Sequence, residues 1–295
     1  MILGAIEAGG TKFVVAIGNE NGNIIDRISF PTTTPQETIN KVIDYFSDKK
    51  IEALGLASFG PIDLNKESKT YGCFTNTPKI GWSDFNIVEA LQKALNIPIG
   101  FDTDVNGAAL AEAVIGDSKH LNSVLYLTVG TGIGGGLILD KKPIHGLSHP
   151  EMGHVRVNVR FDDSYRGNCP YHHNCVESLA AGPSIEKRWG QKANSLSTQH
   201  PAWDLEAYYL SQAICSYILI LSPERIILGG GVMKQKQLFP LIHKYVREGL
   251  NNYLASEMID SDKIEEYIIS PSLADDSGII GALILARREI NYEAV

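Results

Sequence analysis

Two histidines and two cysteines in the middle of the chain have the residue types and the spacing of a metal site. His154, Cys169, His172 and Cys175 follow the pattern H-x14-C-x2-H-x2-C. Thiolate and imidazole ligands at these spacings can close a tetrahedral zinc site with no open position. We therefore expect a structural zinc ion that braces a loop and does no chemistry. His173 is a competing ligand, and a chance cluster without a metal is the alternative.

Two carboxylates, Glu151 and Glu177, flank the residues of this predicted metal site. A metal that holds the backbone still would present both carboxylates to a ligand from fixed positions. The pair therefore predicts a ligand site beside the zinc.

Three glycine-rich segments each lie at the end of a predicted strand: residues 9–12, 130–136 and 229–232. Glycines in a tight turn let backbone N–H groups point at a phosphate, and Thr11 and Lys12 add a hydroxyl and a charge. A glycine hairpin without a ligand is the alternative for any one of them. The first segment is neither a P-loop, because it lacks the G-x4-G-K-[ST] spacing, nor a dinucleotide fingerprint. Taken together, the three segments predict a site for a nucleotide.

Asp104 lies between a predicted strand end and a predicted helix start, in the stretch Asp102-Thr-Asp-Val-Asn106. One interpretation makes it a helix N-cap. Another makes it a general base that takes a proton from a substrate hydroxyl during phosphoryl transfer, a reaction that mainly requires alignment and charge neutralisation. Metal binding by Asp102 together with Asp104 is a weaker third interpretation, because no further acidic residue is adjacent.

Short β-rich segments and helical segments alternate along the chain and must position these residues. In the first third, the order β-β-β-α-β-α-β-α predicts a mixed sheet covered by helices. A strand, a glycine turn and a returning strand occur twice, around residues 9–10 and 130–134. We expect strands at 2–6, 13–17, 24–30, 53–59, 97–101, 124–129, 135–139, 225–228 and 267–270, helices at 35–47, 87–95, 105–115, 176–189, 205–221, 237–251 and 277–289, and a surface loop at 191–203.

The composition excludes several classes of protein. The 295 residues allow two domains or one large α/β unit, and the formal net charge of -8 argues against a nucleic-acid-binding surface. The longest apolar run, near residues 214–221, is too short to span a membrane, and the N-terminus does not have the pattern of a signal peptide. The four cysteines do not form a disulfide framework, and Cys73 and Cys215 are expected to be single thiols. These features predict a cytoplasmic protein.

Together these stretches resemble the ROK sugar kinases, and most closely the bacterial fructokinase branch, from Ile6 to about Ala286. Glu7 and His172, where many ROK proteins have Asp and Cys, resemble that branch. Thr103 and Asn174 depart from the broader family, which commonly has Asn and Gly there. The matching stretches are residues 7–13, 58–61, 77–79 with 81–82, 104–106, 151–154, 169–172 and 175–177.

The resemblance implies an α/β fold of the actin-like, ribonuclease-H-like type, with two lobes and with ATP and sugar in the cleft between them. The N-terminal lobe would be 1–117, completed by the helix 277–295, and the C-terminal lobe 118–276. It also implies that Asp104 is the base and that His154 binds zinc through one nitrogen and sugar through the other. The implied sugar-binding residues are Gly60, Asn76, Asp104, Glu151, His154 and Glu177; the phosphate-binding residues Gly9, Gly10, Thr11, Lys12, Thr131 and Gly132; and the adenosine-binding residues Gly182, Pro183, Gly229, Gly230, Gly231 and Val232.

The expected function is phosphorylation of D-fructose at its 6-hydroxyl, with ATP and Mg²⁺ as the donor complex, structural Zn²⁺ and a homodimeric assembly. A kinase for glucose or mannose is the nearest alternative. A sugar-sensing repressor of the same family would carry a helix-turn-helix domain first, for which a phosphate turn beginning near Glu7 leaves no room. An inactive interaction module is disfavoured by Asp104 and the glycine turns. We expect no nucleic-acid or membrane partner.

Overall fold

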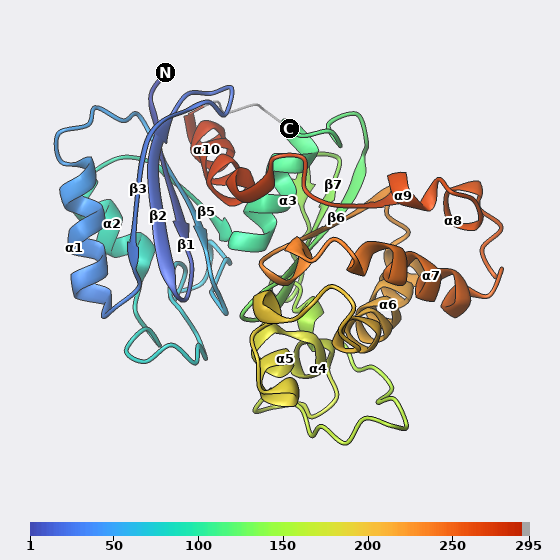
Figure 1. Ribbon diagram of the computed structural model, residues 1–295. Helices are drawn as coiled ribbons and strands as arrows, with labels where there is room; N and C mark the ends of the chain where they lie inside the picture. Colours follow the sequence, from blue (N-terminus) through green and yellow to red (C-terminus); the bar gives the residue numbers. More distant parts are fainter. Residues whose placement is uncertain (291–295) are drawn as a thin grey trace. The chain divides into compact units, whose positions relative to one another are not determined.

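The computed structural model describes residues 1–290, which form parts of two compact units (Figure 1). Unit 1 comprises Met1–Lys119, Lys141–Pro150 and the segment that begins at Asp275. Unit 2 comprises His120–Asp140 and Glu151–Ala274. Each unit contains its own β-sheet with helices, so the predicted α/β class is confirmed.

The sheet of unit 1 has the strand order β3-β2-β1-β4-β5. Its strands are β1 (Leu3–Ala8), β2 (Lys12–Gly18), β3 (Ile24–Pro31), β4 (Leu54–Ser58) and β5 (Ile99–Thr103). The first three strands are antiparallel neighbours, whereas β1, β4 and β5 run parallel, so the sheet is mixed as predicted. Ala8 pairs with Ser58 and Ser58 pairs with Thr103, which places the ends of these parallel strands at one edge of the sheet.

Strand β5 begins two residues later than the sequence pattern predicted. Asn96 has a left-handed backbone conformation (φ 51°) and ends helix α2 (Ile87–Leu95). Pro98 follows two residues later, and proline has no N–H to donate to a strand ladder. The first residues of the predicted strand therefore belong to the connection, and the strand extends to Thr103 instead.

Four helices cover the two faces of the unit 1 sheet (Figure 1). Helices α1 (Pro35–Phe46) and α2 lie on one face, and α3 (Asp104–Val114) and α10 (Ser277–Ile290) lie on the other. Helix α10 packs directly on the strand backbone, since a Cβ at Gly55 of β4 would lie 1.7 Å from the carbonyl oxygen of Ala282. A glycine is therefore required there, because the clash is with backbone rather than with a movable side chain.

The sheet of unit 2 contains strands β6 (Ser123–Val129), β7 (Ile133–Leu139), β9 (Arg225–Gly229) and β10 (Ile268–Ile269), in the order β10-β9-β6-β7. Strands β6 and β7 are antiparallel around a glycine turn, as β1 and β2 are, which confirms the predicted repeat. The helices of this unit are α4 (Val176–Ala180), α5 (Gly182–Trp189), α6 (Ala202–Leu221), α7 (Leu238–Leu250), α8 (Glu257–Asp260) and α9 (Ile264–Tyr267). The sequence pattern did not predict α8 and α9. The two-residue strand β8 (Lys142–Pro143) belongs to unit 1.

The predicted helix 176–189 is two helices in the structure. Ala181 is extended (φ -74°, ψ 158°) and separates α4 from α5. The N–H of Gly182 donates to the carbonyl oxygen of Gly130 (2.8 Å), a bond that a continuous helix would not leave available. Pro183, at the second position of α5, has no N–H and suits the start of a new helix.

The segment 191–203 was predicted to be a surface loop, and this is wrong for its last residues. Trp203 belongs to α6, is 1% exposed, and donates its indole N–H to the carbonyl oxygen of Ser197 (2.7 Å). A large aromatic ring gains enough from burial to hold the preceding residues against the helix.

A buried ion pair fastens the segment that carries the predicted metal ligands. Asp163 accepts from Arg188 of α5 (3.1 Å) and from the hydroxyl of Tyr209 of α6 (2.7 Å). Burial by itself would raise the pKa of Asp163, but the hydrogen bonds and the charge of Arg188 outweigh it and lower the pKa below its ordinary value. The segment is therefore tied to two helices by groups that do not depend on a metal.

Candidate active site and metal centre

The four predicted zinc ligands lie together in unit 2. One potential ligand atom from each of His154, Cys169, His172 and Cys175 lies within 4.8 Å of all the others. Cys169 Sγ lies 3.8 Å from His154 Nδ1 and 3.9 Å from His172 Nδ1, and Cys175 Sγ lies 3.6 Å from His154 Nδ1. Zinc bonds of about 2.0 Å to nitrogen and about 2.3 Å to sulfur give tetrahedron edges of roughly 3.3–3.8 Å. The donor set thus fits zinc, whereas the competing His173 is exposed and is not part of it.

Local structure fixes the cysteines of this cluster. Cys175 is the N-cap of α4, with its sulfur accepting from the N–H of Ser178 (3.4 Å). The hydroxyl oxygen of Ser178 in turn accepts from the N–H of Cys169 (3.1 Å). Burial raises the pKa of the Cys175 thiol to about 12, and the neighbouring Cys169 adds to the rise. A buried thiolate is therefore unfavourable here unless a cation is bound to it, which is the condition that a metal site meets.

His154 has one nitrogen toward the metal cluster and the other toward the two carboxylates. Its Nδ1 faces the cysteine sulfurs, while its Nε2 lies 4.0 Å from Glu151 Oε2 and 4.0 Å from Glu177 Oε1. The second oxygen of Glu177 accepts from the N–H of Ile133 (2.9 Å), which fixes this carboxylate next to the glycine turn. A Cβ at Gly132 would lie 2.7 Å from that oxygen. The zinc cluster, the carboxylates and the glycine turn are thus one connected arrangement.

The other predicted nucleotide residues of unit 2 gather around the ends of β6 and β9. The N–H of Gly182, at the start of α5, donates to Gly130, and a Cβ at Gly130 would lie 3.9 Å from the nitrogen of Gly231. Gly230 has φ +89°, a conformation that favours glycine. A Cβ at Gly231 would meet no atom within 4 Å, so open space adjoins this turn. The structure thereby brings together Thr131, Gly132, Gly182, Pro183, Gly229, Gly230, Gly231 and Val232.

The predicted site residues of unit 1 follow the ends of the parallel strands β1, β4 and β5. The turn of Gly9, Gly10, Thr11 and Lys12 comes directly after β1 and is closed by a bond from the N–H of Gly9 to the carbonyl oxygen of Lys12 (2.9 Å). Gly60 lies two residues beyond β4, and Asp104 directly follows β5. Asn76 is exposed, and its neighbour Thr75 donates its N–H to Pro61 (2.9 Å). Three separate segments therefore reach the same edge of the sheet.

Asp104 is the first residue of α3 and not its N-cap, so that interpretation is wrong. The cap is Thr103, whose hydroxyl oxygen accepts from the N–H of Asn106 (3.1 Å). Asp104 is half-buried, and its Oδ1 accepts from the N–H of Val105 (2.9 Å). Asp102 is 3% exposed and accepts hydrogen bonds from protein groups, which does not favour a metal shared by Asp102 and Asp104.

Two histidines near these strand ends did not emerge from the sequence pattern. His149 Nε2 accepts from the N–H of Ile62 (3.3 Å), two residues after Gly60. His145 Nε2 lies 3.1 Å from the carboxylate of Asp102. Both belong to the segment Lys141–Pro150, and no spacing rule connects that segment with β4 or β5.

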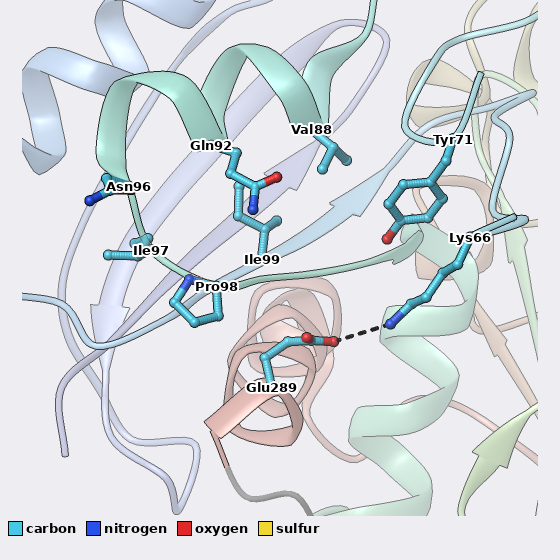
Figure 2. Close-up of a pocket in the computed structure, with 9 residues that line it drawn as sticks. All are labelled: Lys66, Tyr71, Val88, Gln92, Asn96, Ile97, Pro98, Ile99 and Glu289. Atoms are coloured by element: carbon cyan, nitrogen blue, oxygen red, sulfur yellow. Dashed lines mark ion pairs between the residues drawn. The ribbon is translucent and has the colours of Figure 1, made fainter. Parts of the chain in front are cut away.

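A pocket of about 590 Å³ lies elsewhere in unit 1, between the C-terminal part of α2, the start of β5 and the end of α10 (Figure 2). In it, Lys66 Nζ and Glu289 Oε1 form an ion pair of 3.8 Å. Its lining comprises Lys66, Tyr71, Val88, Gln92, Asn96, Ile97, Pro98, Ile99 and Glu289, and none of these is a predicted site residue.

Within residues 1–290, no helix is long and apolar enough to cross a membrane.

Comparison with known proteins identifies the family of this chain. The model of the ROK family matches residues 3–289. A fructokinase from Lactococcus lactis subsp. cremoris is 48% identical over 285 residues, which are 96% of each chain. A fructokinase from Pediococcus pentosaceus is 45% identical over 287 residues, 97% of this chain and 98% of that one. In fold, the structure is similar to that of a ROK family glucokinase from Streptomyces griseus in complex with glucose and AMPPNP, with a TM-score of 0.76 and 21% identity over 98% of this chain and 100% of the other. The chain therefore belongs to the ROK family.

Proposed function

We propose that this protein is an ATP-dependent kinase that phosphorylates D-fructose at its 6-hydroxyl. The observation that carries the chemistry is the common edge of the unit 1 sheet, where the turn of residues 9–12 follows β1 and Asp104 follows β5, with β4 between these two strands. The choice of fructose is supported by full-length relatives that are called fructokinases and are 45% and 48% identical to this chain.

In the proposed reaction, Asp104 accepts the proton of the fructose 6-hydroxyl as that oxygen attacks the γ-phosphorus of ATP. The new bond joins O6 to phosphorus, the bond from the γ-phosphorus to the bridging oxygen breaks, and ADP leaves. Such transfers depend on alignment and on neutralisation of phosphate charge. Gly9, Gly10, Thr11, Lys12, Thr131 and Gly132 would bind the phosphates, while Mg²⁺ would supply further positive charge.

The remaining assignments belong to the same proposal. Glu151, His154 and Glu177 would hold other hydroxyls of the sugar, together with Gly60 and Asn76, and the adenosine would bind at Gly182, Pro183 and residues 229–232. Zinc on His154, Cys169, His172 and Cys175 would be structural. The support is the imidazole of His154, whose two nitrogens face the cysteine sulfurs and the carboxylates respectively. The homodimer remains a prediction, which light scattering on the purified protein tests.

The test is a coupled ADP-release assay of the wild type with fructose, glucose and mannose, alongside Asp104→Asn. We expect the highest kcat/KM with fructose. The variant should lose about 10³-fold or more in kcat, because an amide cannot accept the proton, and should keep its fructose Kd and its melting temperature. Asp44→Asn, which changes an exposed carboxylate on α1, is the matched control and should behave as wild type.

Two results would count against the proposal. A kcat for Asp104→Asn above a tenth of the wild-type value would show that another group acts as the base. A higher kcat/KM with glucose or mannose than with fructose would identify a different hexose as the substrate.

A further inference from the structure

A buried hydrogen-bond network lies directly behind the turn that carries Asp104. At its centre is the carboxylate of Asp102, the last but one residue of β5, which is 3% exposed. Its Oδ1 accepts from the N–H of Thr103 (2.7 Å) and from Nδ2 of Asn106 (2.7 Å), and His145 Nε2 lies 3.1 Å from the same oxygen. The network joins β5, α3 and the segment Lys141–Pro150, all within unit 1.

The chemistry of the three groups fixes the direction of each bond. A carboxylate only accepts, so the Nε2 of His145 must carry a hydrogen whether the ring is charged or neutral. The hydrogen bond with Asp102 raises the pKa of His145 above its usual value, although burial acts against this. In the described part of the chain, Oδ1 of Asn106 is buried without a hydrogen-bond partner. The amide of Asn106 is therefore oriented through its NH₂ group, which donates to Asp102 Oδ1 (2.7 Å) and lies 3.3 Å from His145 Nε2.

Asp104 lies between the members of this network in the sequence. Asp102 bonds to the backbone of Thr103 and to the side chain of Asn106, and Thr103 caps the N–H of Asn106 (3.1 Å). Residues 102–106 thus form one closed turn, which sets the direction of the backbone at Asp104. His145 is the member that comes from a distant part of the chain, 43 residues from Asp102.

A buried carboxylate that loses a hydrogen-bond donor is destabilised by its incomplete solvation, or it shifts until another donor is in reach. Either response acts on the turn of residues 102–106, because the same carboxylate oxygen of Asp102 accepts from Thr103 and Asn106. We propose that His145 is a positioning residue for the reaction, acting through Asp102 and Asn106 on the turn that presents Asp104. This inference rests on the proposed role of Asp104 as the base.

Two variants of His145 that differ by one methylene group test the proposal. In His145→Gln, the amide nitrogen can lie close to the position of Nε2 and can donate to Asp102. In His145→Asn, the shorter side chain keeps a polar amide at a site whose side chain is 39% exposed, but it does not reach Asp102. His120→Ala, which removes an exposed histidine, is the control for the loss of an imidazole.

We expect His145→Asn to lower kcat by about 10- to 100-fold, because misplacing a reacting group by about 1 Å has effects of this size. The KM values for fructose and ATP should stay within about two-fold of wild type, since the bound ground state does not require proton transfer. His145→Gln should recover kcat to within about three-fold of wild type. A residue with only a structural role would instead lower the melting temperature and the yield of active enzyme, and would leave kcat per folded molecule unchanged.

Several outcomes would overturn the inference. These are a kcat for His145→Asn within two-fold of wild type, a Gln variant as impaired as the Asn variant, and a fructose KM that rises as much as kcat falls. Asp104→Asn is assayed in parallel to separate this inference from the proposal it rests on. If Asp104→Asn is inactive and His145→Asn is fully active, only the role of His145 is wrong. If Asp104→Asn stays active, the base itself has been misassigned.

Discussion

The metal cluster yields a sharp prediction because two adjacent histidines differ in their relation to it. His172 Nδ1 lies 3.9 Å from Cys169 Sγ and belongs to the cluster, whereas His173 is exposed and does not. His172→Ala should therefore deprive zinc of a ligand. His173→Ala removes the same chemical group from the same loop and should leave the zinc in place, so it is the matched control.

The size of the effect follows from the position of His154. Its Nε2 lies 4.0 Å from the carboxylate of Glu177, and its Nδ1 lies 3.8 Å and 3.6 Å from the two sulfurs. Without a metal, the ring is held in this orientation by weak contacts to the sulfurs, to the carboxylates of Glu151 and Glu177, and to the ring of His172. Loss of the groups that orient a functional side chain at a metal site typically costs about 10- to 100-fold, or roughly 1.4–2.8 kcal/mol.

We expect this loss to appear in sugar binding. His154 is proposed to hold the sugar in the ground state and the transition state alike, so the KM for fructose should rise about ten-fold or more while kcat changes by less than about three-fold. The KM for ATP should stay within about two-fold of wild type. The measurements are zinc content by plasma mass spectrometry and steady-state kinetics for the wild type and both variants.

Two results would refute this reasoning. If His172→Ala is purified with a full equivalent of zinc, then His172 is not a ligand. If it is purified without zinc and has the same fructose KM as His173→Ala, then the metal does not support the sugar-binding residues.

Two further changes have outcomes that follow from the geometry. Gly132→Ala would place a Cβ 2.7 Å from an oxygen of Glu177 and displace that carboxylate. Steady-state kinetics should then show a fructose KM raised about ten-fold, which is the effect of losing one charge-assisted hydrogen bond. The control is Gly146→Ala, whose new Cβ has no atom within 4 Å and which should match wild type. Asp163→Asn leaves the buried Arg188 without its partner and should cost about 3 kcal/mol in urea unfolding at pH 7. Folding lowers the pKa of Asp163, so the ionised carboxylate stabilises the folded protein fully above the unfolded pKa of about 3.9. This contribution is lost as the pH falls through the lower pKa of the folded state. The free energies of unfolding of the variant and the wild type should therefore converge in acid.

The parts of this structure that the sequence could predict are those fixed by neighbours in the chain. Of the four predicted zinc ligands, three lie within seven residues, from Cys169 to Cys175, and the fourth, His154, precedes them in the same segment. The repeated strand, glycine turn and strand is equally local, because an antiparallel hairpin needs only its own turn to set its register. The predicted repeat is confirmed, and the four residues predicted to bind zinc lie together, while zinc binding itself stays a prediction.

The parts that could not be predicted depend on partners far away in the chain. The break between α4 and α5 is set in part by the bond from Gly182 to Gly130, and these residues are separated by two strands and the metal loop. Helical periodicity continues through Ala181, and the signal that could have shown the break was the dipeptide Gly182-Pro183, which commonly interrupts a helix. His145 is a similar case, because its contact with Asp102 spans 43 residues and follows no motif.

Asp104 shows how contacts decide between interpretations that the sequence left open. A lone Asp before a helix is most often explained as a cap, yet the hydroxyl of Thr103 already caps Asn106 in this turn. A metal shared with Asp102 would need a carboxylate that faces outward, yet Asp102 is buried and accepts from Thr103 and Asn106. With capping assigned to Thr103 and Asp102 held within the protein, neither alternative accounts for a half-buried carboxylate at the end of β5. Proton transfer is the role proposed for this carboxylate, and the kcat of Asp104→Asn tests it.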